Sequence, residues 1–255
     1  MLAAGRGRRM GALTDERPKP LLEVGGRPIL FHQLDALAEA GIRRVAVVVG
    51  YLGERIAEAV AAAQGRGEGR SEFLSDVRSD GALDEWPAVS IELPRQESPL
   101  GTAHALAAAE PALEDAPFLL LLGDLVVPAS VLRRLIDAFE PGVDAVLGID
   151  RQTDPSVGAA VDVESGDDGT LRVRAIVEKP PAGSHPGSWN NTGLYVLPRR
   201  AIALARAVRP SVRGEHELPD VVLALLAEGS VVRALEIEEP LRHLGTARDL
   251  VGPQD

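Results

Sequence analysis

Two glycines and two basic residues near the start of the chain have the types and spacing to bind phosphate. Residues 2–22 read LAAGRGRRMGALTDERPKPLL. Gly5 and Gly7 permit a loop whose backbone N–H groups can approach a phosphate. Arg9 suits bidentate contact with phosphate oxygens, and Lys19, fixed between two prolines, provides a point charge. The segment by itself fits a triphosphate site and solvated charges on a turn about equally well.

Two well-known phosphate-binding loops do not match this segment. A Walker A loop needs a glycine, four residues and then Gly-Lys followed by Ser or Thr, and no such run occurs here. A Rossmann dinucleotide fingerprint needs a third glycine after Gly5 and Gly7, but Met10 stands at that place. The pattern disfavours a plain dinucleotide-binding domain and retains a loop in which a basic residue follows the glycines.

The elements that must position this loop alternate between strands and helices. Apolar runs at 45–49 and 118–122 are each followed by glycine, which is typical of strands buried on both faces. Helical patterns cover residues 28–40, 52–64, 102–110 and 128–139. This alternation predicts an α/β fold, a Rossmann-like three-layer sandwich with a mostly parallel central sheet. A Gly-, Ser- and charge-rich stretch at 65–85 is expected to be a surface loop.

The pattern changes after about residue 145. Three expected strands are separated by turn residues, and they cover residues 159–163, 171–178 and 191–196. We expect them to form a small antiparallel subregion. Two helices are expected to follow, over 199–206 and 218–228.

Composition and charge limit the classes of partner. The 255 residues carry a formal net charge of −11, which argues against nucleic acid as a partner. Local cations and a metal ion can still create a positive pocket for a small anion. Cysteine is absent, which excludes disulfides and thiolate metal sites. No apolar run is long enough to cross a membrane, and the start does not look like a signal peptide, so we expect a cytoplasmic protein without a membrane partner.

The start of the chain resembles sugar-phosphate nucleotidylyltransferases, a family that includes glucose-1-phosphate thymidylyl- and uridylyltransferases. The family signature is a strand, then Leu-Ala-Ala/Gly-Gly-x-Gly-Thr-Arg-Leu/Met, then Pro-Lys-Pro-Leu-Leu. The chain keeps the glycines, Arg9 and Lys19, and departs at Arg8, where Thr is usual. Further matches recur along nearly the whole chain. The resemblance implies one domain over residues 1–255, with 1–140 mainly nucleotide-binding and 141–255 mainly binding the sugar phosphate.

The resemblance also assigns roles in the first of these halves. Gln96 and the run 99–103 look like the family's base-recognition segment, and an amide can both donate and accept. Gly101 and Thr102 could also simply cap the next helix. Asp124, after an expected buried strand, resembles the family's metal aspartate, which implies Mg²⁺; an aspartate in a turn is the alternative. The implied nucleotide-binding residues are Ala3, Ala4, Gly5, Gly7, Gln96, Gly101 and Thr102, and the implied catalytic residues are Arg9 and Lys19.

The resemblance places the sugar-phosphate site in the second half. Glu178 and Asn191 would hold sugar hydroxyls, Lys179 the sugar phosphate, and Gly158 would let the sugar approach the backbone. The stretch 213–220 also resembles the family and is expected to open a helix near the sugar pocket. The alternative for Glu178 and Lys179 is an exposed ion pair, worth at most ~1 kcal/mol.

Two departures from the family pattern bear on function. His243 stands where the family usually has an aspartate that is often the second metal ligand, and imidazole is a poor Mg²⁺ ligand compared with carboxylate oxygen. His243 could therefore touch a phosphate, bind the metal weakly, or be structural. The chain also begins at Leu2 of the motif, so we expect a shortened central strand.

The implied reaction transfers a nucleoside monophosphate from an NTP, with UTP or dTTP favoured, to a sugar-1-phosphate, and releases pyrophosphate. The alternatives are a CTP-dependent cytidylyltransferase and an inactive sugar-nucleotide-binding or regulatory homologue. A glycosyltransferase is disfavoured because the chain lacks the Asp-x-Asp motif that such enzymes usually carry. Homo-oligomer formation is left open by the sequence.

Overall fold

The computed structural model describes residues 1–65, 89–152, 156, 158–166, 169–184, 187 and 189–250. The expected loop at 65–85 lies almost wholly outside these residues. Contacts divide the chain into two compact units that alternate along the sequence. The first unit contains Met1–Ser98, Gly123–Ala129 and Leu241–Asp255, and the second contains Pro99–Leu122 and Ser130–Pro240.

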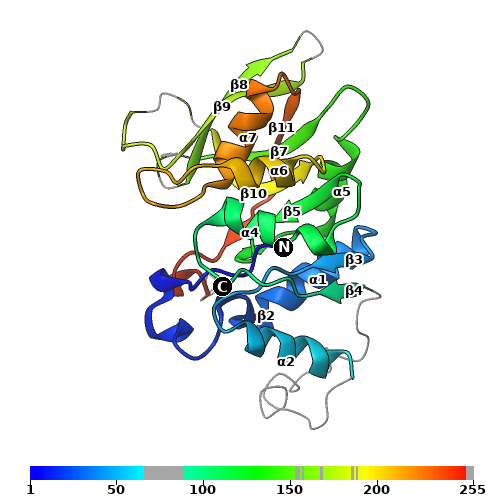
Figure 1. Ribbon diagram of the computed structural model, residues 1–255, viewed down its shortest axis with the longest axis vertical. Coiled ribbons are helices and arrows are strands. Elements are labelled where there is room, and N and C mark those ends of the chain that lie inside the picture. Colours follow the sequence, from blue (N-terminus) through cyan, green and yellow to red (C-terminus); the bar gives the residue numbers. More distant parts are fainter. Residues whose placement is uncertain are drawn as a thin grey trace. The chain divides into compact units, whose positions relative to one another are not determined.

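The first unit contains short strands, 3₁₀ segments and longer helices (Figure 1). Its helices are α1 (Ile29–Glu39), α2 (Gly53–Ala63) and the 3₁₀ segments η1 (Arg8–Thr14), η2 (Lys19–Leu21) and η5 (Ala247–Leu250). Its strands are β1 (Glu23–Val24), β2 (Arg27–Pro28), β3 (Arg44–Ala46), β4 (Ser90–Glu92), β6 (Leu125–Val126) and β12 (Arg242–His243). Met10, Leu22, Val24, Ile29 and Leu244 form a buried cluster, so the glycine-rich start and the end of the chain share one core.

Three neighbouring backbone segments of the first unit run parallel. β3 pairs with β4, Val49 bridges Arg95, and Leu2 bridges Val48, all in parallel. The apolar run at 45–49 was expected to be such a strand, and its apolar character follows from burial on both faces. The residues that follow each segment therefore emerge at the same edge.

The second unit is built on a six-stranded sheet (Figure 1). Its strands are β5 (Phe118–Leu121), β7 (Ala145–Arg151), β8 (Ala159–Ser165), β9 (Leu171–Glu178), β10 (Trp189–Leu197) and β11 (Val232–Glu236). Its helices are α4 (Thr102–Ala108), η3 (Glu110–Ala112), α5 (Ala129–Asp137, whose first residue belongs to the first unit), α6 (Ala201–Ala207) and α7 (Leu218–Ala227). The sheet order is β5-β10-β7-β11-β9-β8, and β8 also pairs with β10, which closes a ring of five strands.

The α/β class is confirmed, but the sheet is mixed rather than mostly parallel. Of the pairings described in the six-stranded sheet, only β11 with β7 is parallel. The run 118–122 forms β5 as expected, yet β5 pairs antiparallel with β10. A continuous apolar run indicates burial on both faces, and an antiparallel strand can be buried in the same way, so the run alone does not decide the direction of its partner.

The expected helices and the antiparallel strands of the second half are present. α4, α6 and α7 pack against one another, and α7 packs on β9. β8 and β9 form an antiparallel pair from Ala159↔Glu178 to Ser165↔Leu171. This pairing brings Gly158 and Lys179 together at one end of the two strands, where the Lys179 N–H donates to the Gly158 carbonyl over 2.7 Å. Among the described helices, none is both long and apolar enough to span a membrane.

Candidate active site

The floor of the site in the first unit is a row of hydrogen-bonded backbone segments. Ala3 N–H donates to the Val48 carbonyl over 2.9 Å, and Gln96 N–H donates to the Val49 carbonyl over 2.8 Å. On the other side of residues 1–4, the Gly123 N–H donates to the Leu2 carbonyl over 2.9 Å. The few residues before Gly5 thus lie between two neighbouring segments. The predicted short strand is present as an isolated bridge with neighbours on both sides.

Small residues allow these segments to approach one another closely. A Cβ atom on Gly123 would lie 2.7 Å from the Leu2 carbonyl oxygen, and one on Gly50 would lie 2.9 Å from the Ala4 carbonyl oxygen. Ala3 and Ala4 are almost fully buried. The arrangement explains the small residues around the motif by backbone packing, in addition to any contact with a ligand.

The glycine-rich loop packs on Lys19. Gly7 adopts a left-handed conformation with φ 67°, which glycine tolerates at no steric cost. A Cβ atom on Gly7 would lie 3.3 Å from Lys19 Cβ and 3.2 Å from Thr14 Cγ2, whereas no described residue other than its chain neighbours lies within 4 Å of one on Gly5. The Thr14 hydroxyl lies 3.2 Å from the Gly7 carbonyl, to which it donates. The loop is therefore held in place by packing and a hydrogen bond at Gly7, whereas Gly5 is not packed in this way.

Lys19 and Asp124 form an ion pair. Lys19 Nζ lies 2.5 Å from Asp124 Oδ2, and the side chains are 11% and 31% exposed, respectively. The sequence suggested a phosphate ligand and a metal ligand at these positions, and the structure brings the two residues together. In this ion pair the ammonium and the carboxylate neutralise each other. Either group could bind a ligand instead, provided that another charge then neutralises its former partner.

Arg9 and His243 flank the Asp124 segment. β12 pairs with β6, so that His243 faces Leu125, and Leu244 N–H donates to the Asp124 carbonyl over 2.9 Å. The exposed Arg9 has its Nη1 atom 3.8 Å from where a Cβ on Gly245 would be. His243 is exposed, which leaves its ring free to meet a ligand. Among the described residues, no group of three or more His, Asp or Glu side chains could hold a metal ion.

Gly101 and Thr102 belong to the second unit, where they fix the start of α7. His216 N–H donates to the Leu100 carbonyl over 2.7 Å, and Ala103 N–H donates to the His216 carbonyl over 2.9 Å. A Cβ atom on Gly101 would overlap the His216 backbone, which explains the glycine. The Thr102 hydroxyl accepts from Leu218 N–H over 2.8 Å. Thr102 therefore caps a helix, as the alternative interpretation held, but the helix is α7 rather than its own.

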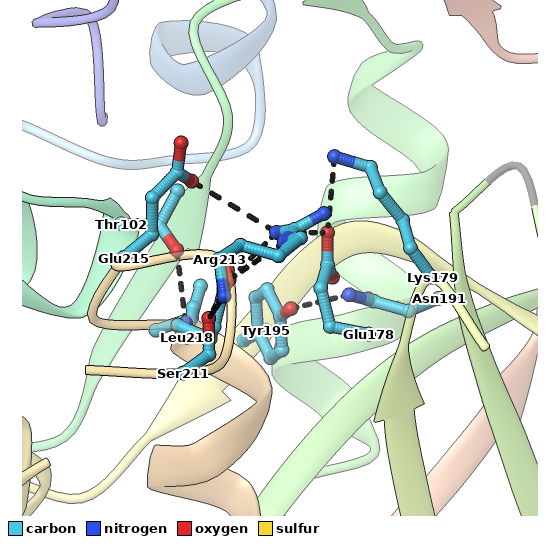
Figure 2. A network of polar contacts seen from close by, with 10 residues as sticks. Thr102, Glu178, Lys179, Asn191, Tyr195, Ser211, Arg213, Glu215 and Leu218 are labelled. Carbon is cyan, nitrogen blue, oxygen red and sulfur yellow. Dashed lines mark hydrogen bonds and ion pairs between the residues drawn. The ribbon is translucent and has the colours of Figure 1, made fainter. Parts of the chain in front are cut away.

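Glu178 is the centre of a polar network in the second unit (Figure 2). Its Oε1 atom lies 3.5 Å from Lys179 Nζ and 3.4 Å from Arg213 Nη2. Burial raises the pKa of Glu178 above its ordinary value; Lys179 lowers this pKa, Glu217 raises it and Arg213 lowers it. The side chain of Glu178 keeps 23% exposure, so the carboxylate can be reached.

Asn191 lies in a bulge of β10 and has both ends of its amide engaged. Its Nδ2 donates to the Tyr195 hydroxyl over 2.5 Å, and its Oδ1 accepts from Gly193 N–H over 2.9 Å. The register of β10 against β7 shifts between Asn191 and Tyr195, and Gly193 has φ 80°. Burial raises the pKa of the Tyr195 hydroxyl, which stays protonated. Asn191 is thereby held in one orientation.

Gly158 does not have open space beside it. A Cβ atom there would overlap the side chain of Asn190, whose buried Oδ1 has no hydrogen-bond partner among the residues that the structure describes. The glycine was expected to let a sugar approach the backbone. In this structure the neighbouring Asn190 amide occupies the space that a side chain at Gly158 would need.

Two charged residues of the site were not singled out from the sequence. Arg213 and Glu217 lie four residues apart, and Arg213 Nη2 is 2.6 Å from Glu217 Oε1. Both belong to the stretch 213–220 that was expected to open a helix near the sugar pocket, and Glu217 does immediately precede α7. The sequence signal was the opposite charge at a spacing of four, which is common on protein surfaces. Only the burial of Glu217, which is 4% exposed, distinguishes this pair from an ordinary surface ion pair.

The predicted site residues thus fall into two sets. The first unit holds Ala3, Ala4, Gly5, Gly7, Arg9, Lys19, Gln96, Asp124 and His243. The second unit holds Gly101, Thr102, Gly158, Glu178, Lys179 and Asn191. Within each unit, the structure joins several members directly, above all Lys19 with Asp124 and Glu178 with Lys179.

Comparison with solved structures gives the fold. The chain is similar to a UDP-glucose pyrophosphorylase complexed with UDP-glucose, with a TM-score of 0.80 at 19% identity, covering 98% of this chain and 93% of the other. It is also similar to a UTP-bound UGPase from Acinetobacter baumannii, with a TM-score of 0.75 at 24% identity over 98% and 88% of the two chains. At these identities the likeness establishes an α/β nucleotidyltransferase fold.

Comparison of sequences gives the family. The chain is 29% identical to the UTP–glucose-1-phosphate uridylyltransferase AglF of Haloferax volcanii, over 100% of this chain and 91% of that protein. It is 31% identical to the glucose-1-phosphate thymidylyltransferase of Streptomyces antibioticus, over 98% of this chain but 63% of that protein. The sequence profile of the nucleotidyl transferase family matches residues 1–251. The chain therefore belongs to the nucleotidyl transferase family of enzymes.

Proposed function

We propose that this enzyme transfers a nucleoside monophosphate from UTP or dTTP to a sugar-1-phosphate, giving an NDP-sugar and pyrophosphate. The observation that carries the proposal is the Lys19–Asp124 pair beside the glycine-rich loop, in a chain of this family. The relatives named above are uridylyl- and thymidylyltransferases of glucose-1-phosphate, which supports the choice of nucleotide and the class of sugar phosphate.

The proposed reaction is an in-line attack of a sugar-phosphate oxygen on the α-phosphorus of the NTP. The bond to the pyrophosphate oxygen breaks as the new P–O bond forms, and no covalent intermediate with the protein is needed. A phosphate oxygen is already ionised, so no strong general base is required. The protein then has to bring two anions together and stabilise the charge that develops on the leaving pyrophosphate.

Three basic residues have roles in this scheme. Arg9 would bind the leaving pyrophosphate, and Lys19 and Lys179 would bind the transferred and the attacking phosphates. Gly5, Gly7 and the backbone of Ala3 and Ala4 would border the nucleotide. Gln96, Gly101 and Thr102 would flank its base, with the Gln96 amide offering a donor and an acceptor.

The acid and amide groups of the second unit would bind the sugar. Glu178 and Asn191 would hold its hydroxyls, and the backbone at Gly158 would border the ring. This role suits Asn191 because Tyr195 and Gly193 fix its amide. It also suits Glu178, whose carboxylate is only partly buried.

The residues present fit Mg²⁺ as a cofactor. The Asp124 carboxylate already accommodates a cation, the Lys19 ammonium, and is partly exposed. Mg²⁺ is commonly held by one or two carboxylates together with substrate phosphates, so Asp124 would suffice on the protein side. His243, which pairs with Leu125 next to Asp124, is the alternative contact to the metal or to a phosphate. When bound, the ion would supply positive charge at the phosphates.

Three finer expectations belong with this proposal. The parallel pairings of the first unit support a Rossmann-like layered arrangement for the nucleotide half. The division into a nucleotide half at 1–140 and a sugar-phosphate half at 141–255 within one domain also stays a prediction. A cytoplasmic location remains a prediction of the same kind.

The test is an assay of pyrophosphate release with Mg²⁺, in which each common NTP is combined with each of a panel of sugar-1-phosphates. Release that requires UTP or dTTP together with a sugar-1-phosphate is the expected result. Release with CTP alone among the NTPs would make the enzyme a cytidylyltransferase. A folded protein that binds nucleotide but releases no pyrophosphate with any pair would overturn the proposal in favour of a binding or regulatory role.

A further inference from the structure

Glu217 is a buried carboxylate whose contacts are concentrated on one oxygen atom. Its side chain is 5% exposed. Glu217 Oε1 accepts from Arg213 Nη2 over 2.6 Å, from Arg213 Nε over 3.2 Å and from the Ser211 hydroxyl over 3.0 Å. A buried charge is costly unless it is paired and hydrogen-bonded, so these contacts hold the guanidinium of Arg213 firmly.

Arg213 links this buried carboxylate to Glu178. The same Nη2 atom that contacts Glu217 lies 3.4 Å from Glu178 Oε1. Figure 2 shows the guanidinium of Arg213 and the ammonium of Lys179 both reaching the same oxygen of the Glu178 carboxylate. Without the guanidinium, the two carboxylates would repel each other. The orientation of Glu178 therefore depends on where Arg213 is held.

The loop that carries Arg213 is fixed at both ends. Ser211 N–H donates to the Glu215 carbonyl and Gly214 N–H to the Ser211 carbonyl, each over 2.8 Å. Arg213 N–H donates to the Ser211 hydroxyl over 3.2 Å. Glu217 itself immediately precedes α7, whose first N–H is capped by the Thr102 hydroxyl. Glu217 is thus a rigid anchor, while Glu178 ends β9 beside Lys179.

We propose that Glu217 is a positioning residue for the sugar half of the site. It holds Arg213 in place, and Arg213 holds the Glu178 carboxylate in the orientation that accepts hydrogen bonds from the hydroxyls of the sugar phosphate. This inference rests on the proposed function. Glu217 itself does not contact the substrate. Because it acts through Glu178, removal of its charge weakens the binding of the sugar-1-phosphate and leaves the binding of the NTP unaffected.

The experiment compares steady-state kinetics of four variants with the unaltered enzyme. Glu217→Gln keeps the shape and a hydrogen-bond acceptor but removes the charge that holds Arg213. Glu215→Gln is the matched control, because Glu215 lies in the same loop, 3.9 Å from Arg213, and is 56% exposed. Glu178→Gln and the double variant Glu178→Gln/Glu217→Gln complete a double-mutant cycle.

The expected result is a rise in KM for the sugar-1-phosphate of about tenfold in Glu217→Gln, the size of one hydrogen bond to a charged group. The KM for the NTP and the kcat stay within about twofold, which is the scatter allowed for independent sites. Glu215→Gln behaves like the unaltered enzyme. In the Glu178→Gln background, Glu217→Gln has no further effect, because its effect acts through Glu178.

Three outcomes would overturn the inference. Glu217→Gln could lower only the Tm and leave the KM for the sugar-1-phosphate unchanged. It could raise this KM by the same factor with and without Glu178, or it could raise the KM values for the sugar-1-phosphate and the NTP alike.

If the unaltered enzyme releases no pyrophosphate, the proposed function fails, and calorimetric binding of the sugar-1-phosphate to the same variants decides the role of Glu217. Loss of affinity in Glu217→Gln but not in Glu215→Gln would support it; equal affinity in both, or no binding at all, would refute it.

Discussion

The charged residues proposed for the site are organised differently in the two units. In the first unit one ammonium faces one carboxylate, Lys19 with Asp124, and the Arg9 guanidinium has no ion-pair partner among the described residues. In the second unit one guanidinium, that of Arg213, lies within ion-pair distance of Glu178, Glu215 and Glu217. The site residues of the first unit thus include an unpaired cation that can bind a ligand, whereas those of the second unit are already paired with one another.

This difference matches the two kinds of ligand that the proposed reaction requires. A polyphosphate needs cations and backbone N–H groups that can turn to it, as the open loop at Gly5 and the exposed Arg9 provide. A sugar needs hydrogen-bonding groups that are already oriented, because many weak contacts must form together. Substitutions in the first unit should therefore mainly affect turnover, and those in the second unit should also affect stability.

The largest effect is expected from Arg9. Arg9→Ala should lower kcat by about 10²–10³-fold, because the leaving pyrophosphate loses an electrostatic contact that strengthens in the transition state. The Tm should change little, since the side chain is exposed. The measurement is pyrophosphate release beside a thermal melt.

Arg55→Ala is the control for Arg9, since Arg55 lies on α2 of the same unit with 62% exposure. It should keep normal turnover. A normal rate in Arg9→Ala would contradict the proposed binding of the leaving pyrophosphate by Arg9. It would also contradict the expectation that substitutions in the first unit mainly affect turnover.

A smaller effect, on stability, is expected from Gly101. Gly101→Ala should lower the free energy of unfolding by about 3 kcal/mol, because a methyl group would overlap the His216 backbone and φ is 119°. Denaturant titration measures this change. Gly142→Ala provides the comparison, because Gly142 has φ 91° but open space around its Cβ position. Equal losses in the two variants would show that backbone strain alone, and not the packing against His216, accounts for the effect.

The smallest effect is expected in the pH dependence of stability. Because the pKa of Glu178 is higher in the folded chain than its ordinary value, the folded state binds this proton more tightly than the unfolded state does. The Glu178 contribution to the unfolding free energy therefore falls as pH rises from the ordinary glutamate pKa through the raised one. Lys179, Arg213, Glu217 and the Tyr195 hydroxyl are the charged or titratable groups that interact with it.

Denaturation between about pH 4 and pH 7 measures this effect. Glu178→Gln removes the titrating group, so its stability should decline less over this range than that of the unaltered protein. Asp220, whose pKa is also raised by burial and then by Glu217, acts in the same direction in both proteins and cancels. Identical pH profiles would show that the pKa of Glu178 is not raised in the folded protein.

Several residues that we propose for the site were recognisable from local patterns. Glycine at position 7, a basic residue at 9 and an aspartate after an apolar run mark positions where the structure has a left-handed backbone, an exposed cation and an ion pair. The structure gives each a physical context, such as the left-handed conformation of Gly7. Helix limits were also predictable, because amphipathic spacing and terminal glycines depend on near neighbours in the sequence.

Other features depended on contacts between distant residues. The antiparallel partner of β5 is β10, which follows about seventy residues later in the chain. An apolar run in the sequence does not indicate which distant strand will pair with it. Thr102 was recognised as a capping residue, but the N–H it caps belongs to Leu218. Likewise, Glu217 differs from the exposed Glu215 only by its burial.

The sequence by itself determined the α/β class, the glycine-rich loop and the charged candidates Arg9, Lys19 and Asp124, because these depend on residue type and short spacing. Only the tertiary structure decided that Lys19 pairs with Asp124, 105 residues away, and that Arg213 joins Glu217 to Glu178. The physical reason is that the energy of a charged group depends on its burial and its partners, which are fixed when distant segments pack together.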